Sequence, residues 1–202
     1  IEREGPGEAS VSEVAKLLSR QGKREQAERF VLETLRAEPE LHGLSASMIR
    51  AMLSGRQAAK AEALARELVA LRPEDAALRT QLSAVLMQIA PPGSEKFDEG
   101  VAEAERAIEL DAEYAPALQQ RAIGLAMAGD MAGAERALLD AAAVAGDDPR
   151  PRLMLVQLLQ QQGREDEAAA LMAEIERDAG HGAPAPSRGT RGPSPTGGSR
   201  EP

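Results

Sequence analysis

Few side chains in this sequence have the types and spacing that catalysis or metal binding requires. The chain has no cysteine, and its two histidines, His42 and His181, stand far apart without a cluster of further ligands around either. The stretch AGDMAG, residues 128–133, lacks the Lys and the Ser or Thr of a phosphate-binding P-loop. Carboxylates are abundant, but runs such as REDEAAA, residues 164–170, are typical of a solvated helix face. We therefore expect no catalytic residues, no metal ligands and no cofactor.

Composition and charge indicate what kind of partner this chain can bind. The 202 residues carry a net charge of −9. The segment from Gly180 has three arginines against one glutamate, or +2, which leaves −11 on residues 1–179. Such an acidic body argues against nucleic acid as a partner. With only Phe30, Phe97 and Tyr114 as aromatic residues, the core must consist of aliphatic side chains, which suits closely packed helices.

The sequence leaves the compartment open. No apolar run approaches the roughly 20 residues that span a bilayer, and IEREGPGEAS at the start contains no signal-peptide core. Because the chain begins with Ile1 rather than methionine, we expect a fragment or a processed product, whose upstream signal, anchor or domain would not be visible. The location is the cytoplasm or, with such an upstream element, the periplasm or cell envelope. Many arginines, few lysines and abundant alanine are typical of proteins from GC-rich bacteria.

A fixed spacing runs through the chain. Small residues recur at separations of 34, 39, 34 and 34, and aliphatic residues follow them at helical intervals. Five residues before the small residue stands a glycine in three of the five cases; the second case has Gly55 one place early, and the third has Glu95. The recurring small residues are Ala27, Ala61, Gly100, Ala134 and Ala168, and the glycines in register are Gly22, Gly129 and Gly163.

Each period reads as two helices joined by a turn. An amphipathic segment precedes every turn, most clearly Leu118, Ala122 and Leu125. Glycine at the turn allows a positive φ where the first helix ends, and a small residue in the second helix allows close approach of the two helices. Ser10 with Glu13 predicts a capping box for the first helix, and Asp75 predicts a cap for the third unit. Pro116 and Pro151 fit near helix starts.

These features resemble an array of tetratricopeptide repeats, whose units are helix-turn-helix pairs with a period of 34 residues. The second helix ends near a proline in the first two units, at Pro39 and Pro73, whereas Ala112 and Gly146 stand there in the next two. The family's aromatic preferences are largely missing, apart from Phe97. The resemblance implies an all-α fold: an α-solenoid, or right-handed superhelix, whose concave side is lined by the first helix of each unit and receives a partner.

We expect three regions along the chain: a linker over residues 1–7, a five-unit array over residues 8–179, and a disordered Gly/Pro/Ser-rich tail over residues 180–202. IAPPGSEK, residues 89–96, contains the insertion near 91–95 that lengthens one period to 39 residues. Consecutive prolines there predict the end of a helix and a longer turn. The insertion is either a tolerated loop extension or a contact loop for a partner.

The resemblance also directs attention to the side chains that would line the concave face. Counting round each first helix from its buried residues places no carboxylate on this face. Basic residues gather at its N-terminal end, while glutamines suited to pairing with a peptide backbone and adaptable methionines occupy the rest. The expected partner-binding residues are Lys16, Arg20, Arg50, Met87, Gln88, Gln119, Ile123, Met127 and Gln157.

Two functional hypotheses remain from the sequence. The first is a non-catalytic scaffold that binds a peptide segment or helix of a partner protein. The second is the C-terminal repeat region of a larger enzyme or envelope or transport protein whose active or anchoring domain precedes Ile1. Self-association is a further prediction, favoured if Leu171, Met172 and Ile175 leave the last helix uncovered. Chaperone-binding members of the family use a Lys and Asn pattern that Ser12 and Arg50 break here, so that activity is not implied.

Overall fold

The computed structural model describes residues 7–181, and within them the chain forms ten helices and no strand. Short turns join the helices in five consecutive pairs, so the second helix of each pair runs back along the first. The helices are α1 (Glu8–Arg20), α2 (Arg24–Ala37), α3 (His42–Ser54), α4 (Ala58–Leu71), α5 (Ala76–Ile89), α6 (Glu95–Leu110), α7 (Ala115–Met127), α8 (Met131–Val144), α9 (Arg150–Gln161) and α10 (Glu165–His181).

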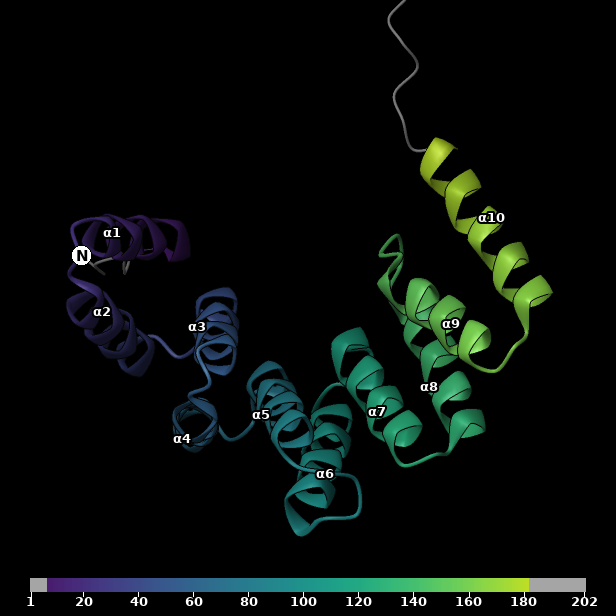
Figure 1. Ribbon diagram of the computed structural model, residues 1–202, viewed down its shortest axis with the longest axis horizontal. Helices are drawn as coiled ribbons and strands as arrows, with labels where there is room; N and C mark the ends of the chain where they lie inside the picture. Colours follow the sequence, from purple (N-terminus) through teal and green to yellow (C-terminus); the bar gives the residue numbers. More distant parts are fainter. Residues whose placement is uncertain (1–6, 182–202) are drawn as a thin grey trace, which may run out of the picture.

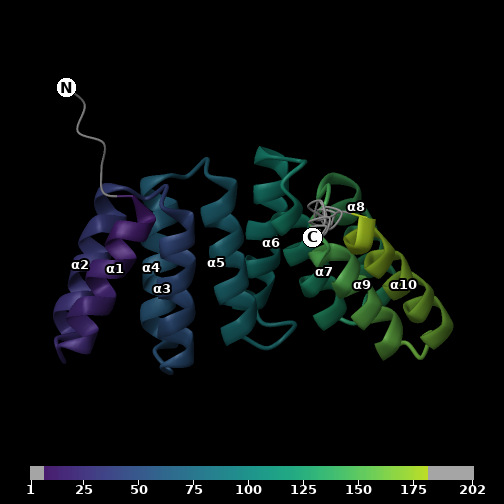
Figure 2. The ribbon, with the colours of Figure 1, turned by 90° about the horizontal axis from the view of Figure 1, so that it is seen from above.

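The five pairs are arranged side by side as an open arc (Figure 1). The first helices α1, α3, α5, α7 and α9 lie toward the inner side of the arc, and their partners lie farther out. Seen from above, the helices form one continuous row along the arc (Figure 2). The expected α-solenoid of helix-turn-helix units is therefore confirmed.

The small residues of the repeat are buried at the helix crossings. Ala27, Ala61, Ala134 and Ala168 are at most 5% exposed, and Gly100 is also buried. Side chains without branches at these positions allow the backbones of two helices to approach closely. Each of the five small residues therefore has the packing role that the spacing predicted.

Burial departs from the repeat pattern at the last helix. Met172 is 37% exposed although its counterpart Leu138 is buried, because no further unit follows α10 within the described residues. Leu171 is half-buried and Ile175 is buried, so α10 leaves less apolar surface uncovered than the sequence suggested. Self-association through this helix stays a prediction.

Backbone geometry at the turns confirms the role of glycine in three units and corrects it in one. Gly22, Gly129 and Gly163 have φ values of 78°, 89° and 74°. In the second unit Gly55 has an ordinary φ of −78°, and the next residue, Arg56, takes the positive value of 57°. In these four units the conformation follows the position in the repeat, because the turn must reverse the chain at that point whichever residue stands there.

Helix ends follow local signals except at the first helix. The Asp75 carboxylate accepts a hydrogen bond from the Leu78 amide at 3.1 Å, as expected of a cap. The capping box expected at Ser10 and Glu13 is wrong: α1 begins at Glu8 after Gly7 and has no side-chain cap. It fails because the helix begins two residues earlier, which places Ser10 inside the first turn.

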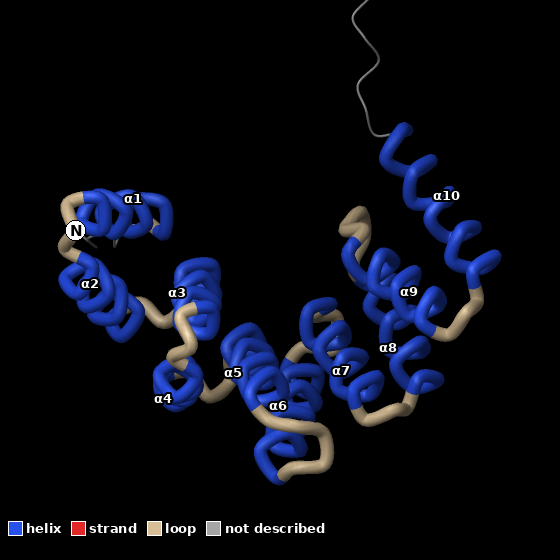
Figure 3. The backbone as a smooth tube through the Cα atoms, viewed as in Figure 1, coloured by secondary structure: helices blue, strands red, loops and turns tan. Residues whose placement is uncertain are grey.

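The prolines of the insertion end a helix as predicted. Helix α5 stops at Ile89, and a loop through Pro91 and Pro92 leads to α6 (Figure 3). The Ser94 hydroxyl caps α6. At the other end of the array, α10 continues to His181, two residues past the expected boundary. The linker expected over residues 1–7 and the tail expected over 180–202 lie almost entirely outside the described residues.

Charged residues connect neighbouring units along the second helices. These ion pairs join residues roughly one repeat apart, so the carboxylate-rich runs are more than a solvated face. Exposed pairs of this kind contribute little individually. They are Arg36 with Glu67, Arg66 with Glu99, Lys96 with Glu62, and Arg164 with Glu135.

A buried carboxylate lies between α5 and α6. Glu103 is 4% exposed and pairs with Arg79 at 2.7 Å and with Arg106. Arg79 also donates a hydrogen bond to the Pro73 carbonyl oxygen at 2.7 Å. Since a buried charge is costly without partners, this network fixes how the two helices of the third unit pack.

Candidate functional site

Two rows of equivalent positions run along the first helices, which lie toward the inner side of the arc, with one residue from each helix. The first row follows from the repeat spacing and includes four of the expected site residues. The second row lies one helical turn farther along each helix and includes three more. The first row is Lys16, Arg50, Ala84, Ile123 and Gln157, and the second row is Arg20, Ser54, Gln88, Met127 and Gln161.

A hollow of about 620 Å³ lies between α5 and α7, where the two rows meet the insertion loop. Gln88 from α5 and Ile123 and Met127 from α7 line it together with Ala84 and Met87, so the structure brings four expected site residues to one place. Pro91 and Pro92 form part of its wall. We call this hollow, with these lining residues, the central hollow.

A smaller hollow of about 120 Å³ adjoins the central hollow between α7 and α9. Gln157 lines it, and Ile123 belongs to both hollows. Ile123 is 36% exposed and Met127 is 42% exposed. Accessible apolar side chains beside a concave wall can be buried against an incoming apolar group. Gln88 and Gln157 can supply hydrogen bonds beside them.

Basic residues mark the N-terminal end of both rows, but one of them is neutralised. The Lys16 ammonium pairs with the Glu13 carboxylate at 2.8 Å on the same helix. Glu13 is three residues from Lys16 and so lies next to it on the helix surface, although the expected lining residues themselves include no carboxylate. Arg20 and Arg50 are exposed and make no ion pair with any residue that the structure describes.

Two further expected residues occupy deeper positions. Gln119 is half-buried, and its Nε2 atom is enclosed without a hydrogen-bond partner among the described residues. Met87 was expected to contact a partner, but it is only 1% exposed. It precedes Gln88 by one residue, and this step of about 100° round the helix turns its side chain away from the inner face and into the junction with α6 and α7. Met87 therefore packs in this junction and borders the central hollow, with almost no surface of its own accessible.

The comparisons with known proteins address the fold directly. No family model and no curated protein matches this sequence. Among solved structures, the chain is similar to TTC0263, a thermophilic tetratricopeptide-repeat protein of Thermus thermophilus, at 23% identity and a TM-score of 0.66, over 87% of this chain and 93% of that one. It is also similar to MamA of Desulfovibrio magneticus RS-1, from residue 41 to its end, at 15% identity and a TM-score of 0.58, over 88% of this chain and 99% of that one.

The chain has the fold of a tetratricopeptide-repeat array. Over the described residues 7–181, no group of three or more potential metal ligands comes together. None of the helices within those residues is long and apolar enough to cross a membrane.

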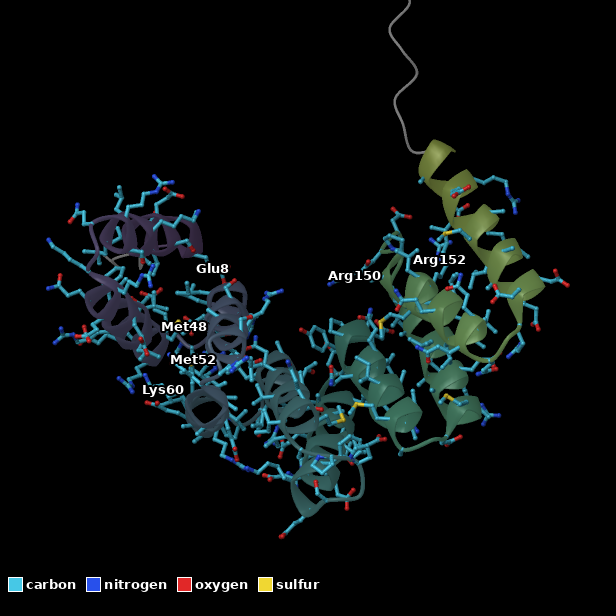
Figure 4. The ribbon with its side chains drawn as sticks, viewed as in Figure 1. Glu8, Met48, Met52, Lys60, Arg150 and Arg152 are labelled. Atoms are coloured by element: carbon cyan, nitrogen blue, oxygen red, sulfur yellow. The ribbon has the colours of Figure 1, made fainter. Side chains whose placement is uncertain are left out.

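The edge of the array where the first helices begin holds contacts that sequence reasoning missed. His42 lies 2.8 Å from the Asp75 carboxylate of the next unit, so this histidine links two units. Tyr114 lies on the same edge, where burial raises the pKa of its hydroxyl group. Arg150 extends from the start of α9 toward the space inside the arc, and Asp148 pairs with it at 2.6 Å (Figure 4). The repeat spacing could have revealed His42 and Asp75 as neighbours, since they stand 33 residues apart.

Proposed function

We propose that the tetratricopeptide array is a non-catalytic scaffold that binds a peptide segment or helix of a partner protein along the inner side of the arc. The observation that supports this most directly is the central hollow, where Ile123 and Met127 remain accessible beside Gln88. Concave apolar surfaces with a few polar groups are the usual form of a binding site. The similarity to other arrays of this fold agrees with a protein partner.

The basic N-terminal end and the apolar middle of the rows contribute differently to binding. Burial of an apolar side chain of the partner against Ile123 and Met127 slows dissociation, because apolar contact is lost only when the complex separates. Arg20 and Arg50 attract acidic residues of the partner and act mainly on the rate of encounter. Binding along the rows therefore combines a basic N-terminal end with an apolar middle.

The test is Ile123→Arg, which places a long charged side chain between the two hollows. A partner obtained by pull-down should bind this variant at least about tenfold more weakly, through faster dissociation. Leu139→Arg is the matched control, because Leu139 is 53% exposed on α8 and lines neither hollow. Both variants should keep the helicity of the natural protein in far-UV circular dichroism.

A second pair of changes separates the basic end from the apolar middle. Arg20→Glu with Arg50→Glu should slow association and weaken its dependence on salt, while dissociation changes little. Binding kinetics at two salt concentrations measure both effects. Unchanged binding by Ile123→Arg, together with loss of binding on deletion of the loop through Pro91 and Pro92, would move the site away from the inner face.

A further inference from the structure

The four junctions between successive units can be compared at three equivalent positions that converge in space. One position is near the end of the first helix, the second is the small residue of the second helix, and the third lies on the first helix of the following unit. From the N-terminal junction onward, the residues are Ser19, Ala27 and Ala51; Leu53, Ala61 and Val85; Met87, Gly100 and Gly124; and Ala126, Ala134 and Leu158.

The third junction shows that the three positions share one space. An ideal Cβ on Gly100 would lie 2.8 Å from the Met87 Cγ, and one on Gly124 would lie 3.0 Å from the Met87 Sδ. Two glycines therefore accommodate the long side chain of Met87. At the second junction Leu53 occupies the corresponding position and packs against the core that contains Ala61 and Val85.

The outer two junctions lack this filling side chain at the first position. At the fourth junction Leu158 enters from the following unit and leaves the small hollow of about 120 Å³. At the first junction all three residues are small, and a hollow of about 310 Å³ remains between α1, α2 and α3. We call this hollow the first-junction slot; it is lined by Ala15, Ser19, Ala27, Met48, Ala51 and Met52, among others.

The slot has the size and chemistry of a side-chain pocket. The slot is open to the surface, and its volume of about 310 Å³ is enough to receive one aliphatic side chain. Met48 and Met52 lie in the space between α2 and α3 (Figure 4), and flexible methionines adapt to an incoming apolar group. The chain itself shows the shape of the occupant, since a leucine or a methionine fills the same position at the next two junctions.

The mouth of the slot is basic, which is unusual on this acidic chain. Arg24 and Gln57 line it, and the residues directly before them, Lys23 and Arg56, are exposed. Neither Lys23, Arg24 nor Arg56 forms an ion pair within the part of the chain that the structure describes. Glu28, which also lines the slot, is already paired with Lys60 at 3.3 Å. Carboxylates on an incoming segment would therefore meet uncompensated positive charge.

We propose that the first-junction slot binds a leucine or methionine side chain presented by an acidic segment of another protein. The partner thus completes the first junction as Leu53 and Met87 complete the next two. This inference rests on the proposed scaffold function and adds a second point of contact, distinct from the central hollow.

Filling the slot from within the chain tests whether the space is open. Ser19→Leu introduces the residue that the second junction carries at this position, so the melting temperature should stay the same or rise. Gly124→Leu is the matched control at the third junction, where Met87 already occupies the space, and overpacking should lower the melting temperature. A fall for Ser19→Leu as large as that for Gly124→Leu would show that the slot is not open and would overturn the proposal.

Methyl NMR of a protein labelled at its methionines tests binding directly. The probe is a short synthetic peptide of glutamates and alanines with one central leucine. It should shift the methyl signals of Met48 and Met52, and a peptide with alanine in place of that leucine should not. The leucine peptide should also lose its effect on Ser19→Leu. Equal shifts from both peptides, or persistence of the shifts in Ser19→Leu, would contradict the assignment.

Other outcomes separate this site from its alternatives. A peptide with lysines in place of the glutamates should bind at least about tenfold more weakly, and equal binding would remove the role of the basic mouth. Shifts of Met127 without shifts of Met48 and Met52 would support the central hollow and reject the slot. Concentration-dependent sedimentation that disappears in both Ser19→Leu and Met172→Ala would make a second copy of this chain the occupant and overturn the choice of another protein.

Discussion

The packing of Met87 against Gly124 predicts a measurable coupling between the two positions. Met87→Ala removes a side chain that is only 1% exposed and leaves a junction lined by glycines, so it should lower the free energy of unfolding by about 2–5 kcal/mol. Gly124→Ala alone gains about 1 kcal/mol of helix propensity. Its Cβ would lie 3.0 Å from the Met87 Sδ and 3.2 Å from the Val101 Cγ2, so crowding should offset most of this gain.

In the background of Met87→Ala the same change at Gly124 should behave differently. The sulfur atom is gone and only the contact with the Val101 Cγ2 at 3.2 Å remains, so most of the helix-propensity gain is kept and the new methyl group fills part of the vacated space. Gly124→Ala should then raise the free energy of unfolding by about 1–2 kcal/mol. The two substitutions should therefore be coupled by about 1 kcal/mol or more, as residues in direct contact are.

Urea unfolding followed by far-UV circular dichroism measures the four free energies, provided that the m-value stays constant across the variants. Gly129→Ala is the control, because its Cβ would contact nothing and its cost comes only from a φ of 89°. That cost should be the same with and without Met87. An equal effect of Gly124→Ala in both backgrounds would show that Met87 and Gly124 do not share a space, and would remove the basis for comparing the four junctions.

Two further predictions concern the turns and the ion pairs. Arg56→Gly should raise the free energy of unfolding by about 0.5–1 kcal/mol, because glycine relieves the strain of a φ of 57° and its greater entropy in the unfolded chain cancels only part of that gain. Arg56→Ala should show no such gain. An equal gain from both variants would refute the explanation. Hydrogen bonds from Lys96 to Glu62 and from Arg66 to Glu99 lower the pKa of both carboxyl groups. Because the folded pKa lies below the unfolded one, this stabilisation is present above the ordinary glutamate value and is lost as the pH falls below about 4. The melting temperature should fall over that range, and a variant carrying Glu62→Gln and Glu99→Gln should fall less steeply; parallel curves would contradict the assignment.

Local residue types were sufficient to predict the units of the array. Ala134 and its counterparts are buried at helix crossings, and Gly129 takes a positive φ at its turn, as the spacing predicted. These features depend on neighbours within one unit, so a repeated pattern reveals them. Arg56 shows where this reasoning ends, because the nearby Gly55 drew the prediction to the wrong residue.

The candidate site was predictable only in part. Gln88, Ile123 and Met127 line one hollow with more accessible side chains, whereas Met87, which borders the same hollow, is buried. A shift of one residue on a helix changes the direction of a side chain by about 100°, and the sequence alone does not define the boundary between inner face and junction that closely. Gly100 and Gly124 carried the missing signal, since glycines at two converging positions indicate a long side chain between them.

By itself the sequence determined the helix pairs and their order, because both depend on interactions between residues close in the chain. Only the tertiary structure decided which junctions are filled and which remain open. The first-junction slot exists because Ser19, Ala27 and Ala51 come from three helices of two units and are all small at once. No one helix carries that information, since the volume left at a junction depends on every side chain that enters it and on how closely the backbones approach.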